Sequence, residues 1–258
     1  MHILIVNDDG IHAPGLEALV NTFSRFAEIT VVAPMREYSG ASRAITINSI
    51  LQVEKVYKNN IFFGYAVDGT PTDCVQLALH VLVIQKPDYV FSGINLGANV
   101  SVNVNYSGTV AAAWEGALEG ITSCAVSLAT QNLESDFTPA SNVAARWLEI
   151  METGKLPKGI LYNINVPSLP YNEIKEFMPV RLSNARFNLD YVKRVSPKGK
   201  HYYWLSGKEL PEGIVDEDND DVDVLRRGYV SVTPLSFADP TDLSVLNVLR
   251  NNDSFNYV

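Results

Sequence analysis

The chain has 258 residues, enough for one large domain or two small ones, each with a hydrophobic core. Hydrophobic residues make up 47% and charged residues 19%, which is typical of a globular protein and excludes disorder for most of the chain. The formal net charge of −9 argues against a general nucleic-acid binder, which needs a basic face, but not against a small phosphorylated substrate held through a cation. We find no run of about 18 apolar residues and no signal-peptide pattern, so we expect a cytoplasmic protein without a membrane span.

The beginning of the chain predicts a strand–helix–strand unit. Residues 2–6 are a short apolar run that stops at a polar turn, as a buried parallel strand does. Pro14 then begins a predicted helix, and a second apolar run at 29–33 ends at Pro34. The apolar stripe of that helix has spacings of three and four: Leu16, Leu19, Val20 and Phe23. The crossover between the two strands is expected to be right-handed.

The next segments continue the alternation of strands and helices. Between residues 45 and 67 the pattern predicts extended strands with a hairpin at 58–60. A helix follows, with Thr70 as its N-cap, Pro71 at its first position and Asp73 as a capping-box acid. We expect its apolar face to contain Leu77, Ala78 and Val81.

A further strand and helix complete the predicted core. Residues 89–91 predict a strand that ends at Ser92-Gly93, and Ser107 begins an Ala-rich helix with Gly120 near its end. The expected apolar side of that helix contains Val110, Trp114 and Leu118. Strands and helices that alternate in this way predict an α/β fold, with a doubly wound, mostly parallel, Rossmann-like sheet.

The apolar periodicity of the sequence becomes weaker after Gly154. We divide the chain into an α/β catalytic core at 1–166 and a β-rich C-terminal extension at 167–258, which packs on the core and is too poor in apolar periodicity for a core of its own. Five segments are predicted here: a last core strand at 160–166, an irregular polar region at 171–225, a solvated acidic loop at 216–223, a strand at 228–235 and a short helix near 242–250.

Three polar clusters each follow a predicted strand, and the carboxyl ends of such strands meet at one edge of the sheet. They are Asn7-Asp8-Asp9-Gly10, Ser39-Gly40-Ala41-Ser42 and Ser92-Gly93-Ile94-Asn95. Two adjacent acids repel one another unless a cation or hydrogen-bond donors compensate. Carboxylate, amide and hydroxyl oxygens suit Mg²⁺ or Mn²⁺ better than Zn²⁺, since no His or Cys is placed to compete. The alternative is that Asp8 and Asp9 only cap the helix near Pro14.

A second clue is the helix start at Ser107-Gly108-Thr109. It offers two hydroxyls, a glycine and free backbone N–H groups at a positive helix end, where an anion is stabilised. The alternative is an ordinary N-cap. A cation site together with such a helix start predicts a phosphate site, and Gly97 and Asn99 suit a loop that approaches a ligand closely.

Other polar and sulfur-containing residues receive structural assignments. Cys74 and Cys124 lie in apolar surroundings and are expected to be buried, reduced thiols. Asp68 and Asp73 are assigned to turn and cap roles. The four histidines have no metal-ligand spacing.

The motifs NDDGIHAPGLEAL, VVAPMREYSGAS, DGTPTDCVQLAL, SGINLGAN and YSGTVAAAWEGAL resemble, in order and spacing, those of the stationary-phase survival protein SurE family. NINVP and GYVSVTPL extend the resemblance over nearly the whole chain. It implies a metal-dependent 5′/3′-nucleotidase, a phosphomonoesterase that acts on nucleoside monophosphates and, in some members, on short polyphosphate. It also implies a homodimer or homotetramer in which the C-terminal arm embraces a neighbour.

The resemblance also assigns the site residues. It implies one divalent metal per subunit with Asp8, Asp9, Ser39 and Asn95 as ligands, and a phosphate held by Asn99, Ser107, Gly108 and Thr109. Two departures bear on the pocket lining and not on the metal ligands. Met35 stands where the family often has an acid, and Ser101-Val102-Asn103 stands where it often has a Gly-Asp-Asp-like stretch.

The expected mechanism is in-line attack by a metal-activated water, with Asp8 or Asp9 orienting it and Asn99 stabilising the phosphoryl charge. Two alternatives compete with it. An aspartyl-phosphate phosphatase needs a nucleophilic Asp two residues before its acid, but Asn7 stands two residues before Asp9. A sensor would bind metal and nucleotide without turnover.

Overall fold

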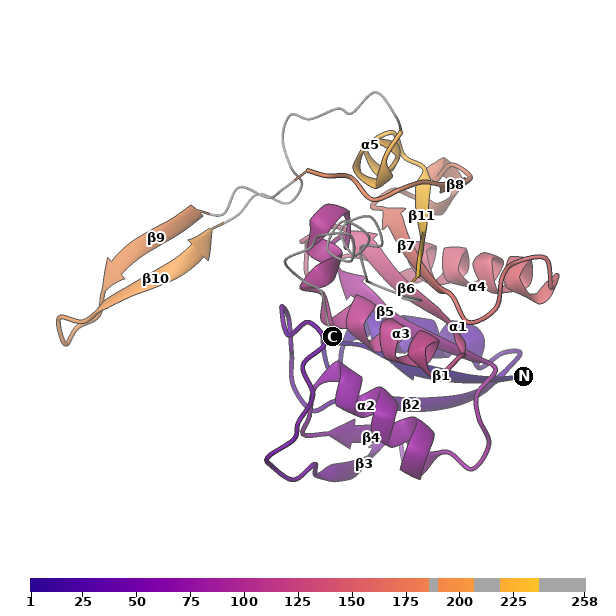
Figure 1. Cartoon of the computed structure of the whole chain (residues 1–258), viewed down its shortest axis with the longest axis horizontal. Coiled ribbons are helices and arrows are strands. Elements are labelled where there is room, and N and C mark those ends of the chain that lie inside the picture. The colour runs from indigo at the N-terminus through magenta and orange to yellow at the C-terminus, as the bar shows by residue number, and fades with distance from the viewer. Residues whose placement is uncertain (186–189, 207–218, 237–258) are drawn as a thin grey trace, which may run out of the picture.

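The computed structural model describes residues 1–185, 190–206 and 219–236, and it shows a central sheet with helices on both faces and a projecting hairpin (Figure 1). The strands are β1 (His2–Val6), β2 (Glu28–Pro34), β3 (Val53–Lys58), β4 (Ile61–Val67), β5 (Tyr89–Leu96), β6 (Thr122–Ala129), β7 (Leu161–Pro167), β8 (Phe177–Pro179), β9 (Asp190–Val195), β10 (His201–Ser206) and β11 (Val230–Leu235). The α-helices are α1 (Pro14–Phe23), α2 (Pro71–Leu77), α3 (Gly108–Leu118), α4 (Thr138–Glu152) and α5 (Asp221–Arg226). Short helical turns cover Ala78–Leu82, Ser101–Asn105 and Tyr171–Glu173.

The strand order of the main sheet locates the site before any side chain is considered. The nine strands run β3-β4-β2-β1-β5-β6-β7-β11-β8, and β4, β2, β1, β5, β6 and β7 are parallel to one another. From β1 the chain proceeds outward to β2 and β4, and then returns to place β5 on the other side of β1. This reversal is a topological switch point, and in open α/β sheets ligands bind in the crevice at the carboxyl ends of its strands. The residues that follow β1 and β5 therefore border the expected crevice.

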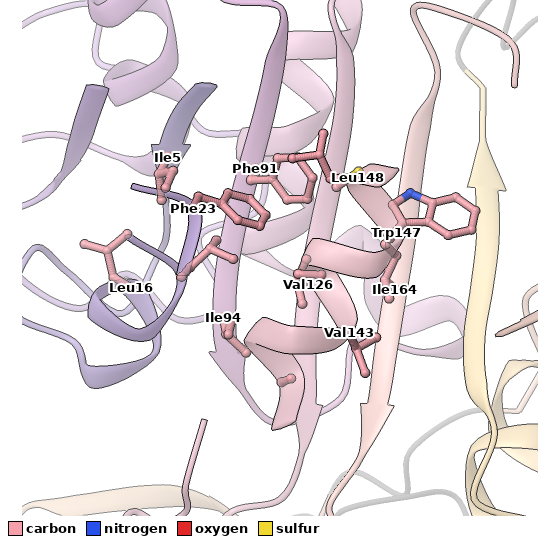
Figure 2. Close-up of a cluster of buried hydrophobic side chains, with 14 of the residues drawn as sticks. Ile5, Leu16, Phe23, Phe91, Ile94, Val126, Val143, Trp147, Leu148 and Ile164 are labelled. Atoms are coloured by element: carbon pink, nitrogen blue, oxygen red, sulfur yellow. The ribbon is translucent and has the colours of Figure 1, made fainter. Parts of the chain in front are cut away.

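The two faces of the sheet are covered by different helices. On one face α1 and α4 enclose the largest core, in which Phe23 meets Phe91 edge to face with ring centroids 4.8 Å apart (Figure 2). On the other face α2 and α3 pack over smaller clusters of Val, Leu and Ala side chains. Complete burial of each large apolar side chain stabilises the fold by roughly 1.5–3 kcal/mol. The sheet edge that carries the site is thus built on a rigid support.

Most of the elements expected in the first half of the chain are confirmed. The capping box of α2 is present, because the Thr70 hydroxyl accepts from the Asp73 backbone N–H while the Asp73 carboxylate accepts from the Thr70 N–H. The hairpin between β3 and β4 turns at Asn59 and Asn60, both with positive φ, as a tight primed turn requires. Cys74 and Cys124 are buried free thiols, as expected.

Three details of the expected elements are wrong. The strand β5 does not end at Ser92-Gly93 but continues to Leu96, so Ser92 is a buried strand residue and only Asn95 lies near the strand end. Val81 and Leu118 are exposed rather than part of apolar faces, because their helices present those positions to solvent.

Sequence reasoning assigned no element to residues 122–152, where the structure has the buried strand β6 and the helix α4. The described part of the region 171–225 is not irregular, since it contains β8, the β9–β10 hairpin and most of α5. The acidic stretch is not a solvated loop in its described part. Asp220 caps α5 and is 1% exposed, while Asp221 is completely buried and accepts hydrogen bonds from the backbone N–H groups of Ser101 and Ser183.

The C-terminal extension contributes to the main sheet. β11 pairs antiparallel with β7 and parallel with β8, so both strands of the extension continue the sheet of the core. In contrast, β9 and β10 pair only with each other and project away from the sheet (Figure 1). The helix predicted near 242–250 lies outside the described residues. Among the residues that are described, no helix is long and apolar enough to cross a membrane.

Candidate metal and phosphate site

The turn after β1 is shaped by Asn7. This residue is completely buried, its amide nitrogen donates to the Gly10 carbonyl at 2.9 Å, and its amide oxygen accepts from the Gly10 N–H at 3.2 Å. Gly10 has φ +100°, a conformation that residues with a side chain rarely adopt. The helix α1 has Ala13 as its N-cap and no side-chain cap bond, so the reading of Asp8 and Asp9 as caps is wrong.

Asp8 lies directly against the start of α3. Its carboxylate accepts a hydrogen bond from the Thr109 hydroxyl and another from the Thr109 backbone, and the residue is only 4% exposed. A Cβ atom added at Gly108 would lie 2.7 Å from Asp8 Cβ and 2.8 Å from Asp8 Oδ2. Glycine is therefore required at this position for the helix terminus to approach the acid so closely.

Asp9 is joined to the end of β5. The Leu96 backbone makes a hydrogen bond to the Asp9 carboxylate, which brings the segments after β1 and β5 together as the switch point predicts. Burial, followed by the neighbouring charge of Asp8, raises the pKa of Asp9 from 3.8 to about 7. Burial also raises the pKa of Asp8, against the hydrogen bonds from Thr109 that lower it. Asp8 is buried and Asp9 is partly buried, and a cation beside them would stabilise the charged form of both carboxyl groups.

The loop after β2 reaches the same place. The Tyr38 N–H donates to the Asp8 carbonyl at 2.8 Å, and the neighbouring Ser39 hydroxyl donates to Glu37 Oε1 at 2.6 Å. The negative charge of Glu37 contributes to the raised pKa values of both Asp8 and Asp9. Three carboxylates thus act on one small volume, which increases the benefit of a bound cation.

A second contact ties this loop to the approach of α3. The Ser42 backbone N–H donates to the Tyr106 carbonyl at 3.1 Å, and the Ser42 hydroxyl donates to the Asn105 carbonyl at 2.6 Å. Since Ser107 follows at once, the segments that carry Ser39 and Ser107 are held side by side.

Asn95 lies in β5 immediately before Leu96. Its amide nitrogen donates to the Gly97 carbonyl at 2.7 Å, which leaves the amide oxygen as an acceptor. An amide oxygen in this state is a suitable ligand for a hard cation.

These donors fit a divalent cation of the Mg²⁺ type. Across residues 1–185, 190–206 and 219–236 no group of three or more His, Cys, Asp or Glu side chains could hold a metal ion. A metal site in this part of the chain must therefore use amide or hydroxyl oxygens besides carboxylates. Asp8, Asp9, Ser39 and Asn95 supply two carboxylates, one hydroxyl and one amide oxygen, and all are hard oxygen ligands.

The predicted phosphate residues occupy different positions. Ser107 is the N-cap of α3, with its hydroxyl accepting from the Val110 N–H at 3.1 Å, so the ordinary capping role is confirmed for it. Thr109 donates to Asp8. Asn99 is 8% exposed, and its amide nitrogen donates to Ser127 Oγ at 2.9 Å. The N-terminal end of α3 lies beside the acid pair, where its partial positive charge favours an anion.

Sequence reasoning missed several polar residues around this edge. Glu37 lies only two residues before Ser39, and this spacing is the sequence signal that places its charge near the site. Asn163 and Asn165 alternate within the otherwise apolar strand β7, and both are completely buried. Burying an amide is costly unless hydrogen bonds compensate, and both of these amides are bonded to the backbone of Asn99.

Comparisons with known proteins agree with this geometry. A family profile described as "Survival protein SurE" matches residues 3–189. A protein of Chlorobium phaeobacteroides named "5′-nucleotidase SurE" is 43% identical over 236 residues, which cover 91% of this chain and 90% of the relative. A protein of Pelobacter propionicus with the same name is 41% identical and covers 96% of this chain and 98% of the relative.

The solved structures give the same result. The crystal structure of the SurE protein from Aquifex aeolicus matches with a TM-score of 0.82 at 34% identity, and the match covers 97% of this chain and 98% of that one. Sequence and structure thus agree over almost the full length, and the chain belongs to the survival protein SurE family.

Proposed function

We propose that this chain is a divalent-metal-dependent phosphomonoesterase that hydrolyses nucleoside 5′- and 3′-monophosphates to nucleoside and phosphate, with short polyphosphate as a further substrate. The observation that carries the proposal is the contact of Asp8 with the N-terminus of α3, where Gly108 leaves no room for a side chain. An acid pair that needs a cation lies there beside a helix end that favours an anion. Relatives at 41–43% identity bear the name 5′-nucleotidase SurE, which supports a nucleotide substrate.

Asp8, Asp9, Ser39 and Asn95 would together hold one Mg²⁺ or Mn²⁺ per subunit. Such a cation supplies Lewis-acid activation of a phosphate oxygen and lowers the pKa of a coordinated water. The raised pKa values of both acids support this assignment, because the folded chain disfavours their charges when no cation is present.

The other residues receive roles in binding and proton transfer. Thr109 fixes the Asp8 carboxylate, and Asp9 or Asp8 orients the attacking water and accepts its proton. Asn99 and the N–H groups of Ser107 and Gly108 would bind the equatorial phosphate oxygens, while Thr109, whose hydroxyl is bonded to Asp8, would contribute through the positive end of the helix. Stabilising charge on those oxygens is the main task in phosphoryl transfer.

The aspartyl-phosphate alternative is disfavoured by Asn7. This residue stands where the nucleophilic acid would be, and both ends of its amide are occupied by Gly10. Trapping of a phosphoaspartate would revive that alternative. The sensor alternative predicts binding without turnover.

The test is a panel of 5′- and 3′-nucleotides and short polyphosphates assayed with Mg²⁺, Mn²⁺ and Co²⁺, with and without a chelator. We expect metal-dependent release of phosphate that is lost in Asp9→Asn. The matched control is Asp68→Asn, which removes an acid that is 47% exposed and pairs with Arg36 at the surface. Chelator-resistant hydrolysis, binding without turnover, or a fully active Asp9→Asn variant would overturn the proposal.

We also propose that the chain forms a homodimer or homotetramer through its C-terminal extension. An isolated two-stranded hairpin is only marginally stable in water. The β9–β10 hairpin nevertheless exposes many large apolar side chains, namely Tyr191, Val192, Val195, Tyr202, Tyr203, Trp204 and Leu205. Replacing residues 190–206 by a short Gly-Ser linker should lower the mass found by sedimentation equilibrium, whereas an unchanged mass would contradict the assignment. The predicted cytoplasmic location stays a prediction.

A further inference from the structure

Asn99 is held by side chains of two neighbouring strands. Its backbone N–H donates to Asn165 Oδ1 at 2.8 Å, and its carbonyl accepts from Asn163 Nδ2 at 2.8 Å and from Asn165 Nδ2 at 3.0 Å. Asn165 therefore offers a donor and an acceptor to one residue, much as a neighbouring strand would. Both backbone groups of this loop residue are fixed by β7.

The Asn99 side chain is fixed separately by β6. Its amide nitrogen donates one hydrogen to Ser127 Oγ at 2.9 Å, and Ser127 is completely buried. A carboxamide nitrogen carries two N–H donors, so one remains for a ligand.

The position of Asn163 and Asn165 in the buried strand β7 indicates more than a structural role. Asn163 and Asn165 share one face of β7 with Leu161, while the opposite face contributes Ile164 to the main core. Within the described residues Asn163 Oδ1 has no hydrogen-bond partner, so the bond of its amide nitrogen to the Asn99 carbonyl is what orients this side chain. A buried amide is costly unless its hydrogen bonds compensate.

We propose that Ser127, Asn163 and Asn165 are positioning residues that hold Asn99 with one amide N–H directed at a phosphate oxygen of the substrate. The inference rests on the proposed function, since the phosphate is the ligand that Asn99 would bind. Positioning matters because a misplacement of about 1 Å in such a site can cost about 10²-fold in rate.

The test is a double-mutant cycle between Ser127→Ala and Asn99→Ala in the full chain. The binding of inorganic phosphate in the presence of Mg²⁺ is measured by calorimetry, alongside kcat and KM for a nucleotide. Loss of the Ser127 hydrogen bond should weaken phosphate binding by about tenfold, raising KM as well. In the Asn99→Ala background the same change should have no further effect. A residue that acted only on folding would weaken binding equally in both backgrounds.

Asn165→Leu removes both bonds to the Asn99 backbone and should lower kcat/KM by about 100-fold. The matched control is Thr233→Val, which replaces a buried polar side chain of β11 opposite Asn163. Among the described residues, the Thr233 hydroxyl has no hydrogen-bond partner. Melting temperatures show whether each variant folds. If Asn165→Leu does not fold, Ser127→Ala alone tests the positioning role.

The outcomes separate this inference from the proposed function. If the wild-type protein binds no phosphate and hydrolyses no nucleotide, the proposed function itself is wrong. Active wild-type protein in which Ser127→Ala binds phosphate within twofold of normal, or in which the two changes are additive, overturns the positioning role alone.

Discussion

Gly108→Ala tests the contact between the acid pair and the helix start. The added Cβ would lie 2.7 Å from Asp8 Cβ, whereas carbon atoms in contact are about 3.5–4.0 Å apart. Asp8 or the first turn of α3 must therefore move by about 1 Å. A displacement of that size in a catalytic site can cost about 10²-fold in rate. We expect a fall of about 100-fold in kcat/KM and weaker Mn²⁺ binding.

The fold should survive this change. Overpacking typically costs about 1–3 kcal/mol, which is smaller than the free energy of unfolding of a typical domain, about 5–15 kcal/mol. The matched control is Gly116→Ala in the same helix, where the added Cβ would lie 2.6 Å from Ser123 Oγ and 2.7 Å from Val90 Cγ2. That variant should lower the melting temperature without a specific loss of Mn²⁺ affinity.

The assays are thermal unfolding, Mn²⁺ titration calorimetry and steady-state hydrolysis of a nucleoside monophosphate. A Gly108→Ala variant with wild-type kcat/KM and wild-type Mn²⁺ affinity would contradict this expectation. It would show that the close approach of Asp8 to the helix start has no role in the chemistry.

Three further predictions follow from the acids. Asp9→Asn should lower kcat by roughly 10³-fold while the circular dichroism spectrum stays native, and near-normal activity with Mg²⁺ or Mn²⁺ would contradict its role. Because burial raises the pKa of Asp9 to about 7, Mn²⁺ must displace a proton below that pH, so the apparent Mn²⁺ affinity should fall by up to tenfold per pH unit as calorimetry is repeated from pH 7 to 5. Burial raises the pKa of Asp221 from 3.8 to about 6, so the folded protein binds more protons between these values and the free energy of unfolding should decrease as pH rises from about 4 to 6. Urea titrations of wild type and Asp221→Asn should differ in this decrease by on the order of 3 kcal/mol, and identical pH profiles would exclude the assignment.

The parts of the fold that could be predicted were those with strong local signals. The βαβ unit at the N-terminus, the capping box of α2 and the Asn59-Asn60 turn each follow from neighbouring residues. The missed strand β6 is a run of small and apolar residues (TSCAVSLA) buried on both faces, which gives no alternation to recognise.

The site could be predicted only in part, for a related reason. The strand-end rule gathers Asp8, Asp9 and Asn95 because topology alone brings those positions together. The hydrogen bonds that hold Asn99 depend on the pairing of β6 with β7, and one of them joins residues 66 positions apart in the chain. Similarly, the acidic neighbours of Asp221 predict a solvated loop, whereas its carboxylate is buried because it accepts hydrogen bonds from backbone N–H groups of distant segments.

The central claim is that Asp8, Asp9, Ser39 and Asn95 share one cation that faces the start of α3. Anomalous diffraction from crystals soaked with Mn²⁺ and inorganic phosphate tests it directly. We expect one manganese peak per subunit in contact with these four side chains, and a phosphate between the metal and Gly108. A manganese ion bound elsewhere, or side chains too far apart to share one ion, would contradict it.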